Sequence, residues 1–190
     1  PSDIGLNEKW LLENEFSQKD ISSYDTTAPN YSLIKCYQNL LNFYPNKSNL
    51  KLNIDLKRID NIHQKSGNIH DSLYVKSLQK LTQTYDSDLL GKAYYKWATF
   101  YYNGYASHSN NKGNKAKAFT ICNEAIKRFG STDLTHNCRI LKQQIEKPSI
   151  RIVTEEVLVP NKHHLASIEH ANTNVVFVNI YKVSASEIEN

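Results

Sequence analysis

Up to Pro148, apolar side chains recur at the spacing i, i+4, i+7 and i+11, which is typical of a helix that buries one stripe. Four segments follow this template, and each is entered through a polar capping residue. Their apolar positions are Leu33, Tyr37, Leu40 and Tyr44; Tyr74, Leu78, Leu81 and Tyr85; Leu90, Tyr94, Trp97 and Tyr101; and Leu134, Cys138, Leu141 and Ile145. The pattern predicts helices that pack as antiparallel pairs joined by short polar loops.

Further segments favour helices with a weaker pattern. Residues 118–129 carry small side chains at the contact positions, so this helix can approach a neighbour closely. Residues 50–56 alternate like a strand, but residues 52–63 also form a helical stripe, and the helical neighbours favour the helix. Residues 6–16 are a candidate for another helix near the N-terminus.

After Pro148 the pattern changes to β-branched and apolar runs with a period of two, which is typical of strands. The runs are residues 150–159, 165–170 and 175–183. They predict three strands in a meander, whereas a complete sandwich domain needs about seven strands. Because the third run is apolar on both faces, we expect the remaining strands to lie beyond Asn190. The predicted fold class is mainly α, then β, with a helical domain over residues 1–147 and an incomplete antiparallel sheet over residues 148–190.

Residues 90–130 resemble a tetratricopeptide repeat. Large side chains on a first helix are followed by small ones on a second, and in such repeats the large ones pack over the small ones. The matching positions are Tyr94, Trp97, Ala98 and Tyr101, then Ala118, Cys122 and Ala125. The loop over residues 103–114 is longer than the standard repeat allows, so the repeat is degenerate. We therefore expect the helical domain to be tetratricopeptide-like.

A set of short strings carries a second, longer resemblance. The strings are Gly91-Lys92-Ala93-Tyr94-Tyr95, Lys115-Ala116-Lys117-Ala118, Ala125-Ile126-Lys127-Arg128-Phe129, Asn137-Cys138, Gln144-Ile145-Glu146-Lys147-Pro148-Ser149-Ile150, Thr154-Glu155-Glu156-Val157, Pro160-Asn161-Lys162 and Val178-Asn179-Ile180-Tyr181-Lys182-Val183. Together they resemble the N-terminal region of large alpha-2-macroglobulin-like proteins of Bacteroidetes. The likeness covers about residues 32–183 and is strongest from Leu89 onward.

In that family a helical, repeat-like segment leads into the first macroglobulin-type β-sandwich domain. The resemblance implies a non-catalytic scaffold or interaction segment of a protease inhibitor in the periplasm or cell envelope. Its implied partners are the remaining macroglobulin-type domains of the parent chain and the proteases that the parent traps. The family's thioester motif is Cys-x-Glu-Gln, but the nearest match, Cys122-Asn123-Glu124-Ala125, ends in a residue without an amide, so no thioester can form there.

Composition narrows the remaining function classes. The net charge of +4, from 23 Lys and Arg against 19 Asp and Glu, is spread along the chain, and this disfavours nucleic-acid binding. No run is apolar enough to span a membrane, and the first ten residues lack a secretory signal. The absence of Met favours a piece of a longer protein. Glu155 and Glu156 are adjacent on a predicted strand and point to opposite faces, so the two carboxylates cannot flank one substrate. We expect neither an enzyme nor a cofactor.

Two clusters admit chemistry of their own. Cys122 and Cys138 lie on the inward stripes of consecutive predicted helices, where they form either a disulfide, which suits an oxidising envelope, or two reduced core thiols. His163, His164 and His170 lie near a predicted hairpin, where turn-exposed histidines are commoner than zinc ligands.

The alternative function is a helical-repeat module that binds a glycan or a peptide. Tyr95, Tyr102 and Tyr105 fall off the predicted stripe, beside the long polar loop. Exposed tyrosines on such a scaffold can stack on sugar rings or grip a peptide. The competing interpretation is an aromatic-rich interface between helices.

Overall fold

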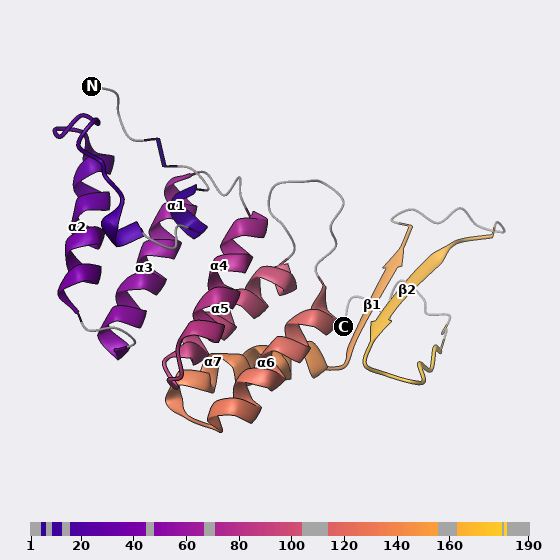
Figure 1. Ribbon diagram of the computed structural model, residues 1–190. Helices are drawn as coiled ribbons and strands as arrows, with labels where there is room; N and C mark the ends of the chain where they lie inside the picture. The colour runs from indigo at the N-terminus through magenta and orange to yellow at the C-terminus, as the bar shows by residue number, and fades with distance from the viewer. Residues whose placement is uncertain are drawn as a thin grey trace, which may run out of the picture. The chain divides into compact units, whose positions relative to one another are not determined.

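The computed structural model describes residues 5–6, 9–12, 16–44, 48–66, 71–103, 114–155, 163–179 and 181. Among these residues the chain is mainly helical and ends in a two-stranded antiparallel sheet, which confirms the predicted order of mainly α, then β (Figure 1). It divides into a helical unit, Pro1–Ile145, and a β unit, Glu146–Asn190.

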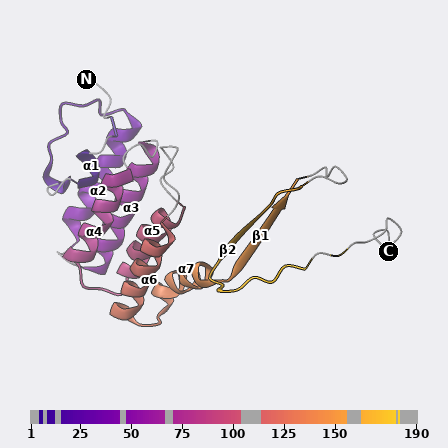
Figure 2. The same cartoon turned by 90° about the vertical axis from the view of Figure 1, so that its right-hand side faces the viewer.

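The helical unit is built from antiparallel helix pairs in chain order (Figures 1 and 2). Its helices are α1 (Lys9–Leu12), α2 (Pro29–Phe43), α3 (Asn49–Lys65), α4 (Asp71–Thr84), α5 (Leu90–Asn103), α6 (Lys115–Phe129) and α7 (His136–Glu146), with 3-10 turns η1 (Phe16–Gln18) and η2 (Asp133–Thr135). Ser48 caps α3 by accepting the Lys51 N–H, and Asn114 caps α6 by accepting the Lys117 N–H. Local capping therefore starts both helices where polar residues precede an apolar stripe.

Helical periodicity locates the core of α3 and α4. The predicted stripe of α4 is buried at all four positions, from Tyr74 to Tyr85. In α3, Leu52, Leu56 and Ile59 are at most 3% exposed, so the strand interpretation of residues 50–56 is wrong. The helical neighbours decide this segment, because a stripe along α3 can be buried on both α2 and α4.

The predicted stripe of α2 is rotated relative to the buried one. Ile34, Tyr37, Gln38 and Leu41 are buried, whereas Leu40 is 36% exposed. The cause is the N-terminal segment, which packs beside α2. There the amide of Gln38 donates to the carbonyl oxygens of Phe16, at 2.9 Å, and Lys19, at 2.8 Å. A polar side chain with two backbone acceptors thus takes a core position outside the predicted stripe.

The predicted N-terminal helix over residues 6–16 is reduced, in its described part, to α1 and the start of η1. Tertiary contacts still bury this segment, with Trp10, Leu11 and Phe16 at most 3% exposed. The guanidinium of Arg58 on α3 donates to the Trp10 carbonyl and lies 4.5 Å from the Phe16 ring centroid. The segment therefore caps the core without needing a long helix.

The β unit contains β1 (Ser149–Thr154) and β2 (Ala166–Ala171), paired antiparallel with Ser149 opposite Ala171 and Ile152 opposite Ile168. The third predicted strand is wrong for its described part, because residues 175–179 and 181 form no strand. Apolar character raises strand propensity, but a strand also requires a paired neighbour. Val175 and Phe177 are instead 61% and 88% exposed.

Alkaline titration tests the packing of α4. Burial raises the pKa of Tyr85 from the ordinary 10.0 to about 12. Below pH 10 the phenol is protonated in the folded and in the unfolded chain, and its contribution to stability is fully present. Between pH 10 and 12 only the unfolded chain loses the proton, so the free energy of unfolding falls. We expect Tyr85→Phe to reduce this alkaline loss by roughly 1–2 kcal/mol while changing stability little at pH 7. Urea unfolding followed by circular dichroism across this pH range measures it, and an undiminished loss in the variant contradicts the assignment.

Candidate functional site

A polar network at the end of α4 joins three helices through Arg128 of α6, which also donates to the hydroxyl of Tyr94 on α5 at 3.5 Å. Its guanidinium donates to the carbonyl oxygens of Thr82, at 2.9 Å, and Tyr85, at 3.2 Å, and pairs with the Asp86 carboxylate at 3.1 Å. The carbonyls at a helix C-terminus lack partners within the helix and favour a cation. Arg128 therefore caps α4 from a different helix. Asp86 contributes to this cap through its ion pair with Arg128.

A second polar cluster joins α3, α4 and α5 around Asp60. Its carboxylate accepts from the Tyr74 hydroxyl at 2.8 Å and from the Lys96 ammonium at 2.9 Å. The His63 ring stacks on Tyr74 with centroids 4.1 Å apart. The pKa of Tyr74 is raised mainly by burial and, second, by the negative charge of Asp60. The cluster holds the helices in register, and its members are too far apart in the sequence for any local pattern to reveal it.

The structure describes two of the three tyrosines that were predicted to contact a ligand. Tyr95 and Tyr102 are half-buried and pack against the hydrophobic core. Lys115 lies over the Tyr102 ring, 5.8 Å from its centroid. Tyr105 lies outside the described residues. The two described rings therefore act as part of the helix packing and offer a ligand only a fraction of their surface.

The structure brings the two candidate cysteines together. Cys122 on α6 and Cys138 on α7 are both 0% exposed and hydrogen-bonded through their side chains, as free thiols. This hydrogen bond is the main cause that lowers the pKa of Cys122, and the positive charge of Lys142 lowers it further. Burial acts in the opposite direction. The bond and burial both raise the pKa of Cys138, whose sulfur also lies 3.7 Å from the Gly91 carbonyl oxygen.

Sequence reasoning missed Gly91 itself. A Cβ atom there would lie 2.4 Å from the carbonyl oxygen of Leu134 in η2, so glycine allows α5 and η2 to touch. The available signal was Leu90-Gly91-x-x-Tyr94, because tetratricopeptide repeats use Leu-Gly-x-x-Tyr at the corresponding place.

Of the histidines near the hairpin, His163 and His164 precede β2, whereas His170 lies within it. Nδ1 of His164 lies 3.3 Å from the Glu155 carboxylate, while His170 stands opposite Ile150 in the sheet register. His163 is exposed. Within the described part of the chain, no three His, Cys, Asp or Glu side chains group as a metal site would require.

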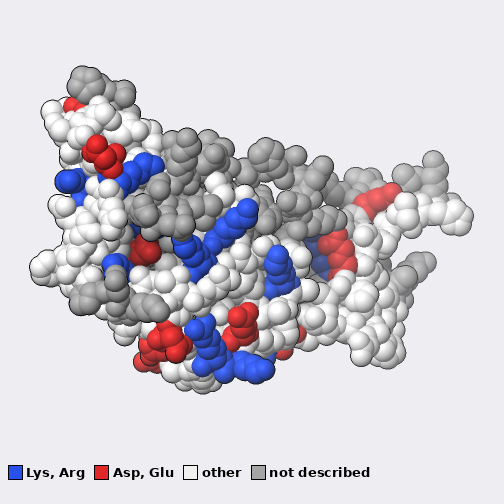
Figure 3. Space-filling model, viewed as in Figure 1, with Lys and Arg blue, Asp and Glu red and all other residues white. Residues whose placement is uncertain are grey.

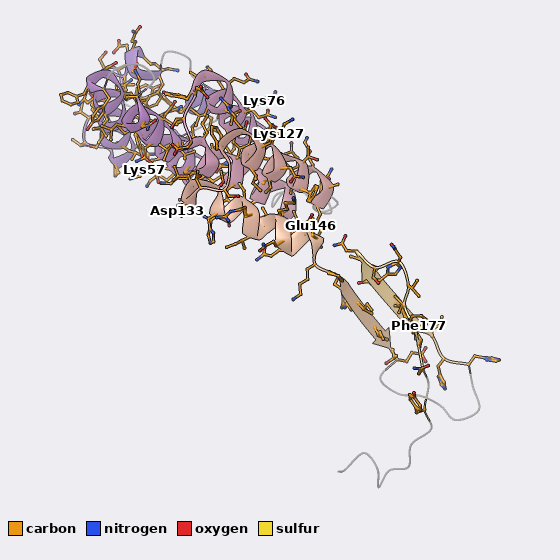
Figure 4. The ribbon with its side chains drawn as sticks, turned by 90° about the horizontal axis from the view of Figure 1, so that it is seen from below. Lys57, Lys76, Lys127, Asp133, Glu146 and Phe177 are labelled. Atoms are coloured by element: carbon orange, nitrogen blue, oxygen red, sulfur yellow. The ribbon has the colours of Figure 1, made fainter. Side chains whose placement is uncertain are left out.

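The sheet of the β unit carries an open apolar face. Because side chains alternate along a strand, Ile150, Ile152 and Ile168 share one face, and they are 53%, 57% and 37% exposed. The opposite face carries Arg151, paired to Glu169 at 3.6 Å, together with one exposed apolar side chain, Val153. The side chain of Phe177, 88% exposed, adds to the apolar surface of this unit (Figure 4).

The surface charge bears on nucleic acids as partners, and the length and apolar content of the helices bear on membranes. On the face shown in Figure 3, Lys and Arg are interspersed with Asp and Glu, which differs from the single-sign stripe of nucleic-acid-binding domains. Among the helices that the structure describes, none combines the length and apolar content of a membrane span.

Comparison with known proteins adds no relative. No family model, no curated protein and no solved structure matches the chain. A function for the chain therefore has to come from its residues and from the geometry of its two units.

Substitutions at the α4 cap distinguish the hydrogen bonds of Arg128 to backbone carbonyls from its ion pair with Asp86. Arg128→Gln removes the cation that binds two backbone carbonyls, and we expect a loss of about 1–2 kcal/mol, since the side chain is 34% exposed. Asp86→Asn removes only an exposed ion pair and should cost about 0–1 kcal/mol. Urea unfolding measures both, with Lys127→Gln, on the solvent side of the same helix, as the matched control. Equal losses for Arg128→Gln and Lys127→Gln contradict the capping role.

Proposed function

We propose that the chain is a non-catalytic scaffold segment of an alpha-2-macroglobulin-like protease inhibitor of the bacterial cell envelope. The helical unit serves as a tetratricopeptide-like spacer. The β unit supplies the first strands of a macroglobulin-type sandwich, and the remaining strands and domains belong to the parent chain. Proteases are the targets of that parent, and the chemistry that restrains them lies in its other domains.

The observation that carries this proposal is the open apolar face of the sheet. A sheet of two strands is at best marginally stable in water by itself. Here one face presents Ile150, Ile152 and Ile168 to solvent, while the other presents Arg151 and Glu169. Strands of an antiparallel sandwich have this division, with the apolar side turned to a second sheet. The sheet is thus suited to be covered by further strands.

The helical unit supports a structural role in a different way. The two polar clusters, around Arg128 and Asp60, direct their hydrogen bonds to other helices of the unit. Such contacts stiffen a stack of helices. The macroglobulin identity, the envelope location and the protease targets rest on the resemblance over residues 32–183. The half-buried Tyr95 and Tyr102 favour this role over glycan or peptide capture.

Hydrogen exchange on a longer chain tests the proposal. The 190-residue chain is compared with the same chain extended by about 100 residues that its gene encodes next, the size of one sandwich domain. We expect amide exchange in residues 149–154 and 166–171 to slow by at least tenfold in the extended chain, because a second sheet covers the apolar face.

Two matched variants make this test specific to the apolar face. In the extended chain, Ile152→Ser, on the covered face, should restore fast exchange, whereas Val153→Ser, its neighbour on the opposite face, should leave exchange slow. Equal exchange in the short and extended chains, or a stop codon directly after Asn190, contradicts the proposal.

A further inference from the structure

We infer that Cys122 and Cys138 form a disulfide that clamps α7 onto α6 when the chain meets a disulfide donor such as oxidised glutathione. This clamp is independent of the proposed scaffold function, because it concerns only the helical unit.

The geometry of the α6–α7 seam selects this pair of thiols. Cys122 lies on the buried face of α6 with Ala118 and Ala125, whose small side chains leave room for a close neighbour. Cys138 lies on α7 in side-chain contact with it. The third cysteine, Cys36, is exposed on α2. The fold thus pairs two thiols and leaves the remaining one apart.

The environment also distinguishes the roles of the two sulfurs. The side-chain contact with Cys138 and the positive charge of Lys142 lower the pKa of Cys122, while the same contact and burial raise the pKa of Cys138, so a thiolate forms more readily on Cys122. Cys122 is therefore the attacking thiol. Because both sulfurs are fully buried, attack on an external disulfide requires α7 to open locally, or takes place while the chain folds.

The exchange proceeds in two balanced steps. The Cys122 thiolate attacks one sulfur of oxidised glutathione, which forms a mixed disulfide and releases one glutathione thiolate. Cys138 then loses its proton and attacks the Cys122 sulfur, which forms the intramolecular bond and releases the second glutathione thiolate. The two protein thiols lose two electrons and two protons, and oxidised glutathione is reduced to two molecules of glutathione.

The bond would act where α7 has few other anchors. Cys138 and Leu141 are the two buried side chains among the residues of α7. A bond between Cys122 and Cys138 closes a short loop that contains the end of α6, η2 and the start of α7. The loss of chain entropy in the unfolded state then stabilises the folded unit. The clamp holds the helix from which the chain continues into β1.

Thiol counting tests the bond in a Cys36→Ser background, which removes the exposed thiol. The chain is unfolded, reduced, refolded with reduced and oxidised glutathione, and alkylated before intact-mass measurement. We expect no alkylated thiol, no glutathione adduct, and a tryptic peptide that links Cys122 to Cys138. Two alkylated thiols, or stable glutathione adducts on them, overturn the inference.

Thermal unfolding tests the clamp. The oxidised Cys36→Ser chain should melt roughly 6–12 °C above its reduced form. Cys36→Ser/Cys138→Ala, which cannot form the bond, should melt at one temperature in both redox conditions. Hydrogen exchange in residues 136–146 should slow on oxidation in the first variant alone. Equal melting temperatures for the oxidised and reduced Cys36→Ser chain overturn the clamp.

Discussion

The helical unit depends on one close backbone contact, in which η2 lies directly against Gly91 of α5. A side chain at this position would place its Cβ atom 2.4 Å from the Leu134 carbonyl oxygen, a separation that atoms do not reach. The turn cannot easily retreat, because the Thr135 hydroxyl donates to the Gly130 carbonyl oxygen at 2.7 Å and accepts the Thr132 N–H at 3.1 Å. The contact therefore fixes where the chain starts α7.

The arrangement of the later helices follows from that contact. Since α7 begins directly after η2, Cys138 is carried to the Gly91 carbonyl and to the Cys122 thiol on α6. The small side chains of Ala118 and Ala125 let α6 pack closely in the same region. Arg128, one turn further along α6, then reaches back to the end of α4. One glycine thus positions a buried thiol pair and contributes to the packing of the last three helices.

Periodicity alone could predict the fold class and several core stripes, because one face of each helix is buried on its sequence neighbours. The α2 stripe was misplaced because the partner carbonyls of Gln38 belong to an N-terminal segment that has no local signal. Residues 175–183 had strand-forming composition, but no sequence pattern tells whether a pairing edge is present. Arg128 and Asp60 bring together three helices each, so their networks depend on tertiary contacts. Cys122 and Cys138 were accessible to prediction because both lay on inward stripes.

The most direct test of this account is the unfolding free energy of Gly91→Ala, measured by urea titration and circular dichroism. Alanine forms helices better than glycine by about 1 kcal/mol, so a free surface position would be stabilised. We predict instead a loss of about 1–3 kcal/mol, because the added methyl group collides with the η2 backbone. Lys92→Ala, at the exposed next position of α5, should stay within about 0.5 kcal/mol of the parent chain. A Gly91→Ala chain as stable as the parent, or more stable, would contradict the account.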